Sequence, residues 1–182
     1  MVVMVVAKIK NKKQIGVFID GANFWNCQKK NGWRVDFYKL KKFFYSRGFV
    51  KDFYYFTPEM PHLETFLEGL SKLGYIVVKK PIKVFRARNK EGIYEVKHKG
   101  NLDIEMAITI FKNIKEYDEV VLVTGDSDFE CILDELKLSD KNIVCLCNST
   151  SLAHELKGKS DIVFTLDKLK KTLRYKKQPP RG

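Results

Sequence analysis

The chain has 182 residues, 45% of them apolar, and a formal net charge of +12. These values are typical of a single globular domain with a sizeable core. The apolar run at residues 1–7 is too short for a membrane span or a secretory signal, which argues against a membrane protein. Four cysteines without a CxxC pair are typical of reduced core residues, so we expect a cytoplasmic protein.

The positive charge is unevenly distributed along the chain. All 22 acidic residues lie in the range 14–167, where 23 basic residues nearly balance them. The excess comes from four lysines in 8–13 and seven basic residues in 168–182, and another basic segment spans 79–99. Such ends favour contact with a polyanion such as RNA, although merely solvated ends would have the same composition. We therefore predict a basic N-terminal segment (1–13), one folded domain (14–166), and a basic C-terminal helix and tail (167–182).

Strand and helix patterns alternate along nearly the whole chain. In chain order we expect strand 15–20, helix 22–30, helix 36–47, strand 49–56, helix 63–73 and strand 75–78. A hairpin of 84–88 and 93–97 follows, and then helix 102–114, strand 119–124, helix 127–138, strand 143–147, helix 151–157, strand 162–164 and helix 167–175. This alternation predicts an α/β fold in which helices cover both faces of a mostly parallel sheet.

Two of the expected strands stop at an acidic residue. Asp20 ends the first strand, and Asp126 follows the strand at 119–124. Ligands of open α/β sheets bind at the carboxyl ends of neighbouring strands, and Asp103 and Asp128 lie in first helical turns that can reach this edge. Three or four carboxylates suit Mg²⁺ or Mn²⁺, which prefer oxygen ligands and assist phosphate chemistry.

Each acid also has a structural explanation. Ser127 and Glu130 fit a capping box, in which Asp128 would only complement the helix dipole. Asp103 in a first turn has the same explanation. Asp20 and Asp126 directly follow apolar strands, where a structural acid has little to do, so we expect these two to be functional.

Several polar residues near these acids are candidates for substrate contact. Asn23 can face an ion or the scissile phosphate, or bond to local backbone. Thr124 and Ser127 can donate hydrogen bonds to phosphate oxygens. Ser151 can do the same, with an ordinary helix N-cap as its alternative role.

The basic segment 79–99 is the second expected contact with RNA. Arg86, Arg88 and Lys99 would bind phosphates without reading the sequence. Tyr94 and Phe85 would stack on bases, with core packing as the alternative for Phe85.

Together these motifs resemble the NYN domain, a family of PIN-like nucleases that includes the LabA-like proteins. The resemblance covers about 14–166. The matching segments are Val17-Phe18-Ile19-Asp20-Gly21-Ala22-Asn23, Lys99-Gly100-Asn101-Leu102-Asp103, Val123-Thr124-Gly125-Asp126-Ser127-Asp128-Phe129, and Ser151-Leu152 followed by Ser160-Asp161.

The resemblance implies a Rossmann-like, three-layer sheet and metal-dependent hydrolysis of RNA. It assigns catalysis and metal binding to four acids with an amide beside them, namely Asp20, Asp103, Asp126, Asp128 and Asn23. Many relatives carry one more acid late in the helix after Asp103, where this chain has Thr109. Glu105 could take the place of that acid, or it could face away from the site, because it lies only two residues after Asp103 in the same helix.

We therefore expect a Mg²⁺- or Mn²⁺-dependent ribonuclease acting on single-stranded or structured RNA. A non-catalytic RNA-binding or regulatory module with a weak metal site is the alternative, which Thr109 favours slightly. A haloacid dehalogenase-type phosphotransferase would need a second acid two residues after Asp20, where the chain has Ala22. A homodimer is compatible with either of the first two functions.

Overall fold

Six parallel strands form the central sheet of the protein, in the order β3-β2-β1-β6-β7-β8. The computed structural model describes residues 12–88 and 94–176. The strands are β1 (Gln14–Asp20), β2 (Phe49–Pro58), β3 (Ile76–Lys80), β6 (Glu119–Val123), β7 (Asn142–Cys147) and β8 (Ile162–Thr165). The central strands β1 and β6 are almost wholly buried, as apolar, β-branched runs in a covered parallel sheet should be.

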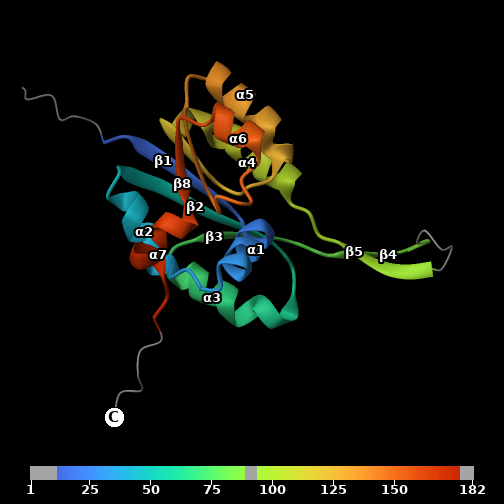
Figure 1. The fold of residues 1–182 in the computed structure, drawn as a ribbon. Coiled ribbons are helices and arrows are strands. Elements are labelled where there is room, and N and C mark those ends of the chain that lie inside the picture. The colour runs from blue at the N-terminus through green and yellow to red at the C-terminus, as the bar shows by residue number, and fades with distance from the viewer. Residues whose placement is uncertain (1–11, 89–93, 177–182) are drawn as a thin grey trace, which may run out of the picture.

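Helices pack on both faces of this sheet, so the predicted three-layer α/β fold is confirmed (Figure 1). One face carries α1 (Gly21–Asn31), α2 (Phe37–Tyr45), α3 (Glu64–Lys72) and α7 (Leu166–Leu173). The other carries α4 (Asp103–Asn113), α5 (Glu130–Leu138) and α6 (His154–Lys159). Short 3₁₀ turns lie at η1 (Pro61–Leu63), η2 (Ile114–Glu116) and η3 (Ser127–Phe129). None of the helices in the described ranges is long and apolar enough to cross a membrane.

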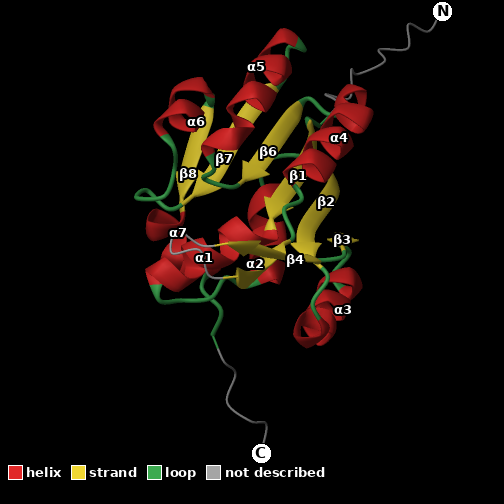
Figure 2. Ribbon diagram, turned by 90° about the vertical axis from the view of Figure 1, so that its right-hand side faces the viewer, coloured by secondary structure: helices red, strands yellow, loops and turns green. Residues whose placement is uncertain are grey.

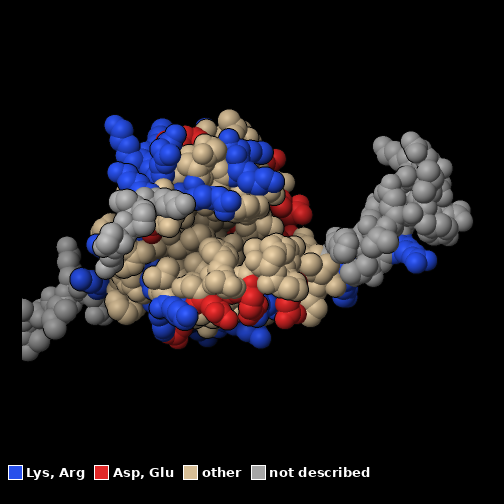
Figure 3. Space-filling view, turned by 90° about the horizontal axis from the view of Figure 1, so that it is seen from below, with Lys and Arg blue, Asp and Glu red and all other residues tan. Residues whose placement is uncertain are grey.

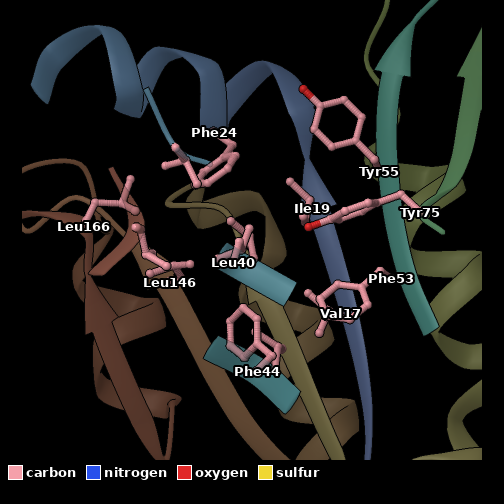
Figure 4. Packing of buried hydrophobic residues seen from close by; sticks show 14 of the residues in the cluster. Val17, Ile19, Phe24, Leu40, Phe44, Phe53, Tyr55, Tyr75, Leu146 and Leu166 are labelled. Carbon is pink, nitrogen blue, oxygen red and sulfur yellow. The ribbon is translucent and has the colours of Figure 1, made fainter. Parts of the chain in front are cut away.

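The apolar spacing of the helices explains how they pack. Leu40 and Phe44 are four residues apart in α2, so they share one face, and both are fully buried in the same core as Val17 (Figure 4). Each side chain of this size contributes about 1.5–3 kcal/mol when it is fully buried. This packing holds the strands, and therefore the residues at their ends, in fixed positions.

The predicted hairpin is also present. Strands β4 (Lys83–Arg88) and β5 (Tyr94–Lys99) pair antiparallel, with Val84 opposite His98, and project from the body of the molecule (Figures 1 and 2). Its turn at 89–93 lies outside the described residues. The same holds for the side chains of Arg88, Lys99, Phe85 and Tyr94, so their expected RNA contacts stay predictions.

One expected helix start is confirmed and one is wrong. The helical segment expected at 127–138 begins at Ser127 with the 3₁₀ turn η3 and continues as α5. The side chain of Asp126, and not that of Ser127, provides its cap, because the Asp126 carboxylate accepts a hydrogen bond from Asp128 N. The capping box considered as an alternative role is therefore not formed. Helix α6 begins at His154 with Ala153 as its N-cap residue, so Ser151 is not an N-cap. Ser151 lies instead in a turn whose N–H groups bond to the carbonyl oxygen of Asn148.

Candidate active site

The carboxyl ends of β1 and β6 bring two of the predicted acids to one edge of the sheet. The strands pair in register, with Ile19 opposite Val123, so the residues that follow them lie side by side. Asp20 and Asp126 then line a common cleft of about 240 Å³ together with Asp103 from the start of α4. Asp103, Asp126 and Asp128 each offer a carboxylate oxygen, and these three atoms lie within 4.8 Å of one another. The four predicted acids therefore converge, with Asp20 beside the closest three.

Asp20 is held by the first turn of α1 and by β6. Its Oδ1 accepts a hydrogen bond from Asn23 N at 3.1 Å, and its Oδ2 accepts one from Thr124 Oγ1 at 3.3 Å. Burial raises the pKa of Asp20 above its ordinary value of 3.8, and the charges of Asp103 and Asp126 raise it further. The Asn23 and Thr124 hydrogen bonds oppose this change by favouring the carboxylate.

The turn between β6 and α5 is braced by two polar side chains. Asn23 Oδ1 accepts a hydrogen bond from Gly125 N at 3.0 Å, and Asp126 N donates one to Thr124 Oγ1 at 3.3 Å. Asp126 Oδ1 in turn accepts from Asp128 N at 3.1 Å. Asp126 and Asp20 therefore have similar roles. Each follows or ends a strand of the sheet, and each caps the helical turn that comes next.

Asp103 is positioned by its own segment. Its N–H donates to Asn101 Oδ1 at 2.8 Å, and Asn101 Nδ2 donates back to the Asp103 carboxylate. Burial raises the pKa of Asp103, and the charges of Asp126, Asp128 and Glu105 raise it further. This role of Asn101 was not predicted from the sequence, although an Asn two residues before a helix start is a signal for such a turn, because Asn side chains bond to the backbone N–H two residues on.

Glu105 does not extend the acidic site. Its carboxylate forms an ion pair with Lys80 at the end of β3, and this pairing lowers the pKa of Glu105. Thr109 Oγ1 donates to the Glu105 carbonyl oxygen at 2.7 Å within α4. Thr109, at the position where the resemblance implies a further acid, therefore has its hydroxyl bonded within its own helix.

The donor set fits a hard divalent cation. All of the converging side chains offer carboxylate oxygens, the ligands that Mg²⁺ and Mn²⁺ prefer. Burial, and to a smaller extent the charges of the neighbouring acids, raises the pKa values of Asp20 and Asp103. A cation between these oxygens would favour the charged carboxylates and offset the repulsion among them.

The other expected contact residues whose side chains are described differ in exposure, and none of them is among the residues that line the acidic cleft. Thr124 is only 1% exposed, and its hydroxyl bonds to Asp20 and Asp126. Ser127 is exposed on η3, and Arg86 is exposed on β4. Ser151 Oγ accepts a hydrogen bond from Lys30 Nζ at 3.0 Å, which links the segment before α6 to α1.

Comparison with known families agrees with the fold and the acids. The model of the NYN domain family matches residues 14–167 of the chain. The protein therefore belongs to the NYN domain family, and its six-stranded parallel sheet with helices on both faces is the PIN-like α/β fold that the resemblance implied.

Two individual proteins are similar to the chain over most of its length. The chain is 29% identical to the low amplitude and bright protein LabA of Synechococcus elongatus over 170 residues, which cover 91% of this chain and 90% of LabA. A crystal structure of a Vibrio parahaemolyticus protein of unknown function superposes with a TM-score of 0.75, at 18% identity, over 92% of this chain and 99% of that one. At that identity the second comparison supports the fold alone.

Proposed function

We propose that the protein is a ribonuclease whose activity depends on Mg²⁺ or Mn²⁺. The observation that carries the proposal is the convergence of Asp103, Asp126 and Asp128 within 4.8 Å, beside Asp20, at the carboxyl edge of the sheet. Membership of the NYN domain family supports the same activity. The proposal places the protein in the cytoplasm, where a reducing environment keeps its four cysteines free.

In this proposal the residues of the cleft have different roles. Asp20 and Asp126 would hold a bound ion, directly or through water, and Asp103 and Asp128 would complete the site and orient the attacking water. Such an ion would supply charge compensation for the phosphate and would lower the pKa of that water. Asn23 has its oxygen bonded to Gly125 N and keeps its amide N–H groups for a phosphate oxygen. Thr124 acts indirectly, because it positions Asp20 and Asp126.

The test is cleavage of an end-labelled single-stranded RNA by the wild type and two variants. Asp126→Asn should slow cleavage by about 100-fold or more, since the loss of several kcal/mol of charge stabilisation corresponds to such a factor. Asp140→Asn is the matched control. It makes the same chemical change at an exposed site before β7, and Asn tolerates the positive φ of 55° found there. Cleavage that persists in excess EDTA and in Asp126→Asn would contradict the proposal.

A non-catalytic RNA-binding module is the second candidate. The observation that favours it is the pair of residues Thr109 and Glu105, which leaves α4 with a single acid facing the site. This function predicts RNA binding by the wild type and no cleavage in Mg²⁺ or Mn²⁺. The same assay, read for binding and for cleavage, separates the two candidates.

A further inference from the structure

A second and larger cavity opens beside the acidic cleft. It has a volume of about 850 Å³, within the range of about 300–1,000 Å³ typical of ligand sites. Its walls come from α1, the segment that leads into α2, η1, α3 and Tyr175 after α7. Figure 3 shows this side of the molecule as a broad, largely uncharged surface, hollowed near its middle. We call this cavity the aromatic groove.

Exposed aromatic rings line the aromatic groove. The exposed fractions of Trp25, Tyr38, Phe66 and Tyr175 are 38%, 55%, 39% and 54%, whereas large aromatic side chains are more often buried. Four such rings around one hollow form a continuous apolar patch, and patches of this kind mark binding sites.

One wall of the aromatic groove is a stacked cation and ring. The Arg34 guanidinium carbon lies 3.8 Å from the centroid of the Trp25 ring. The segment that carries Arg34 is held by the residues that follow α7. Tyr175 N donates to the Arg34 carbonyl oxygen at 2.8 Å, and Val35 forms a β-bridge with Arg174. A preformed pair of this type presents a flat surface and a positive charge together, which is how proteins bind bases of single-stranded nucleic acid.

The aromatic groove is continuous with the acidic cleft. Ala22, Asn26 and Pro58 line both cavities, so the two meet at the first turn of α1. If one phosphate of a nucleic-acid strand lies among the aspartates, the neighbouring nucleotides of that strand lie at this junction.

The charge of the groove suits such a strand. Asp36, the acidic residue among the described residues that line it, caps α2 through Lys39 N and pairs with Lys39 Nζ. Arg34 supplies a positive charge on the same lining. The negative charge of Asp36 is therefore largely compensated, and the Arg34 guanidinium remains to attract a phosphate.

We propose that the aromatic groove binds unpaired nucleobases of the RNA strand that is cleaved at the acidic cleft. The inference rests on the proposed ribonuclease function and adds its substrate class, because only single-stranded RNA can turn its bases into a groove of this kind. Stacking on Trp25 and Tyr38 accepts any base, so the site confers a preference for single strands and no sequence preference.

The test combines protein variants with RNA that lacks bases. Binding of a labelled single-stranded RNA is measured by anisotropy in EDTA, alongside an RNA of the same length in which several nucleotides are abasic. Trp25→Ala and Tyr38→Ala are the groove variants. Phe49→Ala is the matched control, because Phe49 is 49% exposed at the amino end of β2, at the opposite edge of the sheet. Thermal unfolding confirms that each variant is folded, and cleavage in Mg²⁺ is measured on the same preparations.

The proposal predicts that each groove variant binds intact RNA roughly 10-fold more weakly than the wild type does. The wild type should bind the abasic RNA more weakly than the intact RNA by the same factor of about 10. Trp25→Ala should bind the abasic RNA about as weakly as the wild type does. The salt dependence should be unchanged, because the phosphate contacts remain. Phe49→Ala should bind like the wild type.

Groove variants with wild-type affinity, or a wild type that binds abasic RNA equally well, would overturn the proposal. If the groove instead bound a second copy of the chain, Trp25→Ala would change the sedimentation coefficient and leave RNA affinity unaltered, which also overturns it. Cleavage distinguishes this failure from that of the proposed function. Cleavage without base-dependent binding rejects the groove alone, whereas base-dependent binding without cleavage by the wild type rejects the ribonuclease function.

Discussion

Asp20 has two roles that place opposite demands on its charge. As the cap of α1 it accepts a hydrogen bond from Asn23 N, which favours the carboxylate. Its burial and the charges of Asp103 and Asp126 favour the protonated form, and these effects are larger, since its pKa is raised above 3.8. Asp20 is therefore both a carboxylate that a bound cation would stabilise and the cap of α1.

Replacement of Asp20 by Asn should separate the two roles. Asn keeps an oxygen for the cap but carries no charge, so cleavage should fall by about 100-fold or more while the fold is retained. An acid with a raised folded-state pKa binds its proton more tightly in the folded chain. In the absence of divalent ions, the free energy of unfolding of the wild type should therefore fall as the pH rises from 3.8 through the raised pKa.

Asp20→Asn should lose less stability over that pH window, and at pH 7 its melting temperature in EDTA should equal or exceed that of the wild type. Thermal unfolding across the window measures both proteins. A variant with a clearly lower melting temperature at pH 7 would show that the charge of Asp20 stabilises the ion-free fold, contrary to this account.

Among single residues, the functional acids easiest to predict from the sequence are those that directly follow an apolar strand. Asp20 and Asp126 each follow an apolar strand, and their convergence needed only the parallel sheet. The ion pair of Glu105 with Lys80 was not predictable, because it depends on how β3 lies against α4. The buried position of Thr124 was missed for the same reason, since both of its partners belong to the folded site.

The turn between β6 and α5 is the element that positions Asp126 and Asp128. Gly125 lies at its centre, with its N–H bonded to Asn23 and its carbonyl oxygen accepting from Ala153 N at 3.1 Å. A Cβ atom on Gly125 would overlap the carbonyl oxygen of Ser151 and the Sγ of Cys147. The close approach of these segments therefore requires glycine.

Gly125→Ala should destabilise the protein by about 1–3 kcal/mol, as overpacking in a well-packed region does, and should also reduce cleavage because the turn must shift. Gly158→Ala is the matched control in α6, where a Cβ meets nothing within 4 Å. That change should stabilise the helix by up to about 1 kcal/mol. Urea denaturation of both variants measures the difference, and equal stabilities would contradict the packing described for Gly125.

Element types were more predictable than element starts. Hydrophobic periodicity identified α2 through Leu40 and Phe44, because both side chains face the core. The cap before η3 and α5 was not predicted, because the side chains of Asp126 and Ser127 can both accept a backbone hydrogen bond and sequence alone does not rank them. The start of α6 was misplaced because Asn148 holds a turn that no local propensity encodes.

On the scale of the whole molecule, helix α7 of the basic C-terminal segment packs into the core. Leu173 is fully buried, so removal of 168–182 would damage the core. Lys13 likewise pairs with the buried Glu119. The contribution of positive charge to RNA binding is therefore better tested by substitution than by truncation.

The triple variant Lys168→Gln, Lys170→Gln and Lys171→Gln should bind RNA with a weaker salt dependence. The logarithmic slope should fall by about 0.7 for each phosphate group that the protein no longer neutralises. All three lysines are exposed on α7, which packs beside α1 and α2 near the aromatic groove.

The control triple Lys112→Gln, Lys115→Gln and Lys137→Gln removes the same charge from exposed sites that precede β6 and β7, at the opposite edge of the sheet. Its salt dependence should stay close to that of the wild type. Identical slopes for the two triples would show that α7 makes no local contact with RNA.

The aromatic groove shows where whole-molecule prediction failed. Its rings come from α1, α2, α3 and the residue Tyr175 after α7, which are separate segments of the sequence. Only the packing of the helices brings Trp25, Tyr38 and Tyr175 around one hollow. The acids could be predicted because one sheet edge collects them, whereas no single element collects these rings.

The central claim is that the converging aspartates form one divalent cation site. A crystal structure of the protein soaked in manganese, recorded at a wavelength where manganese scatters anomalously, tests this most directly. The account predicts an anomalous peak beside Asp126 and within ligand distance of carboxylate oxygens of at least one of Asp20, Asp103 and Asp128. The peak should disappear in crystals of Asp126→Asn. Well-ordered crystals in which manganese binds only elsewhere on the protein, with these carboxylates left apart from it, would contradict the claim.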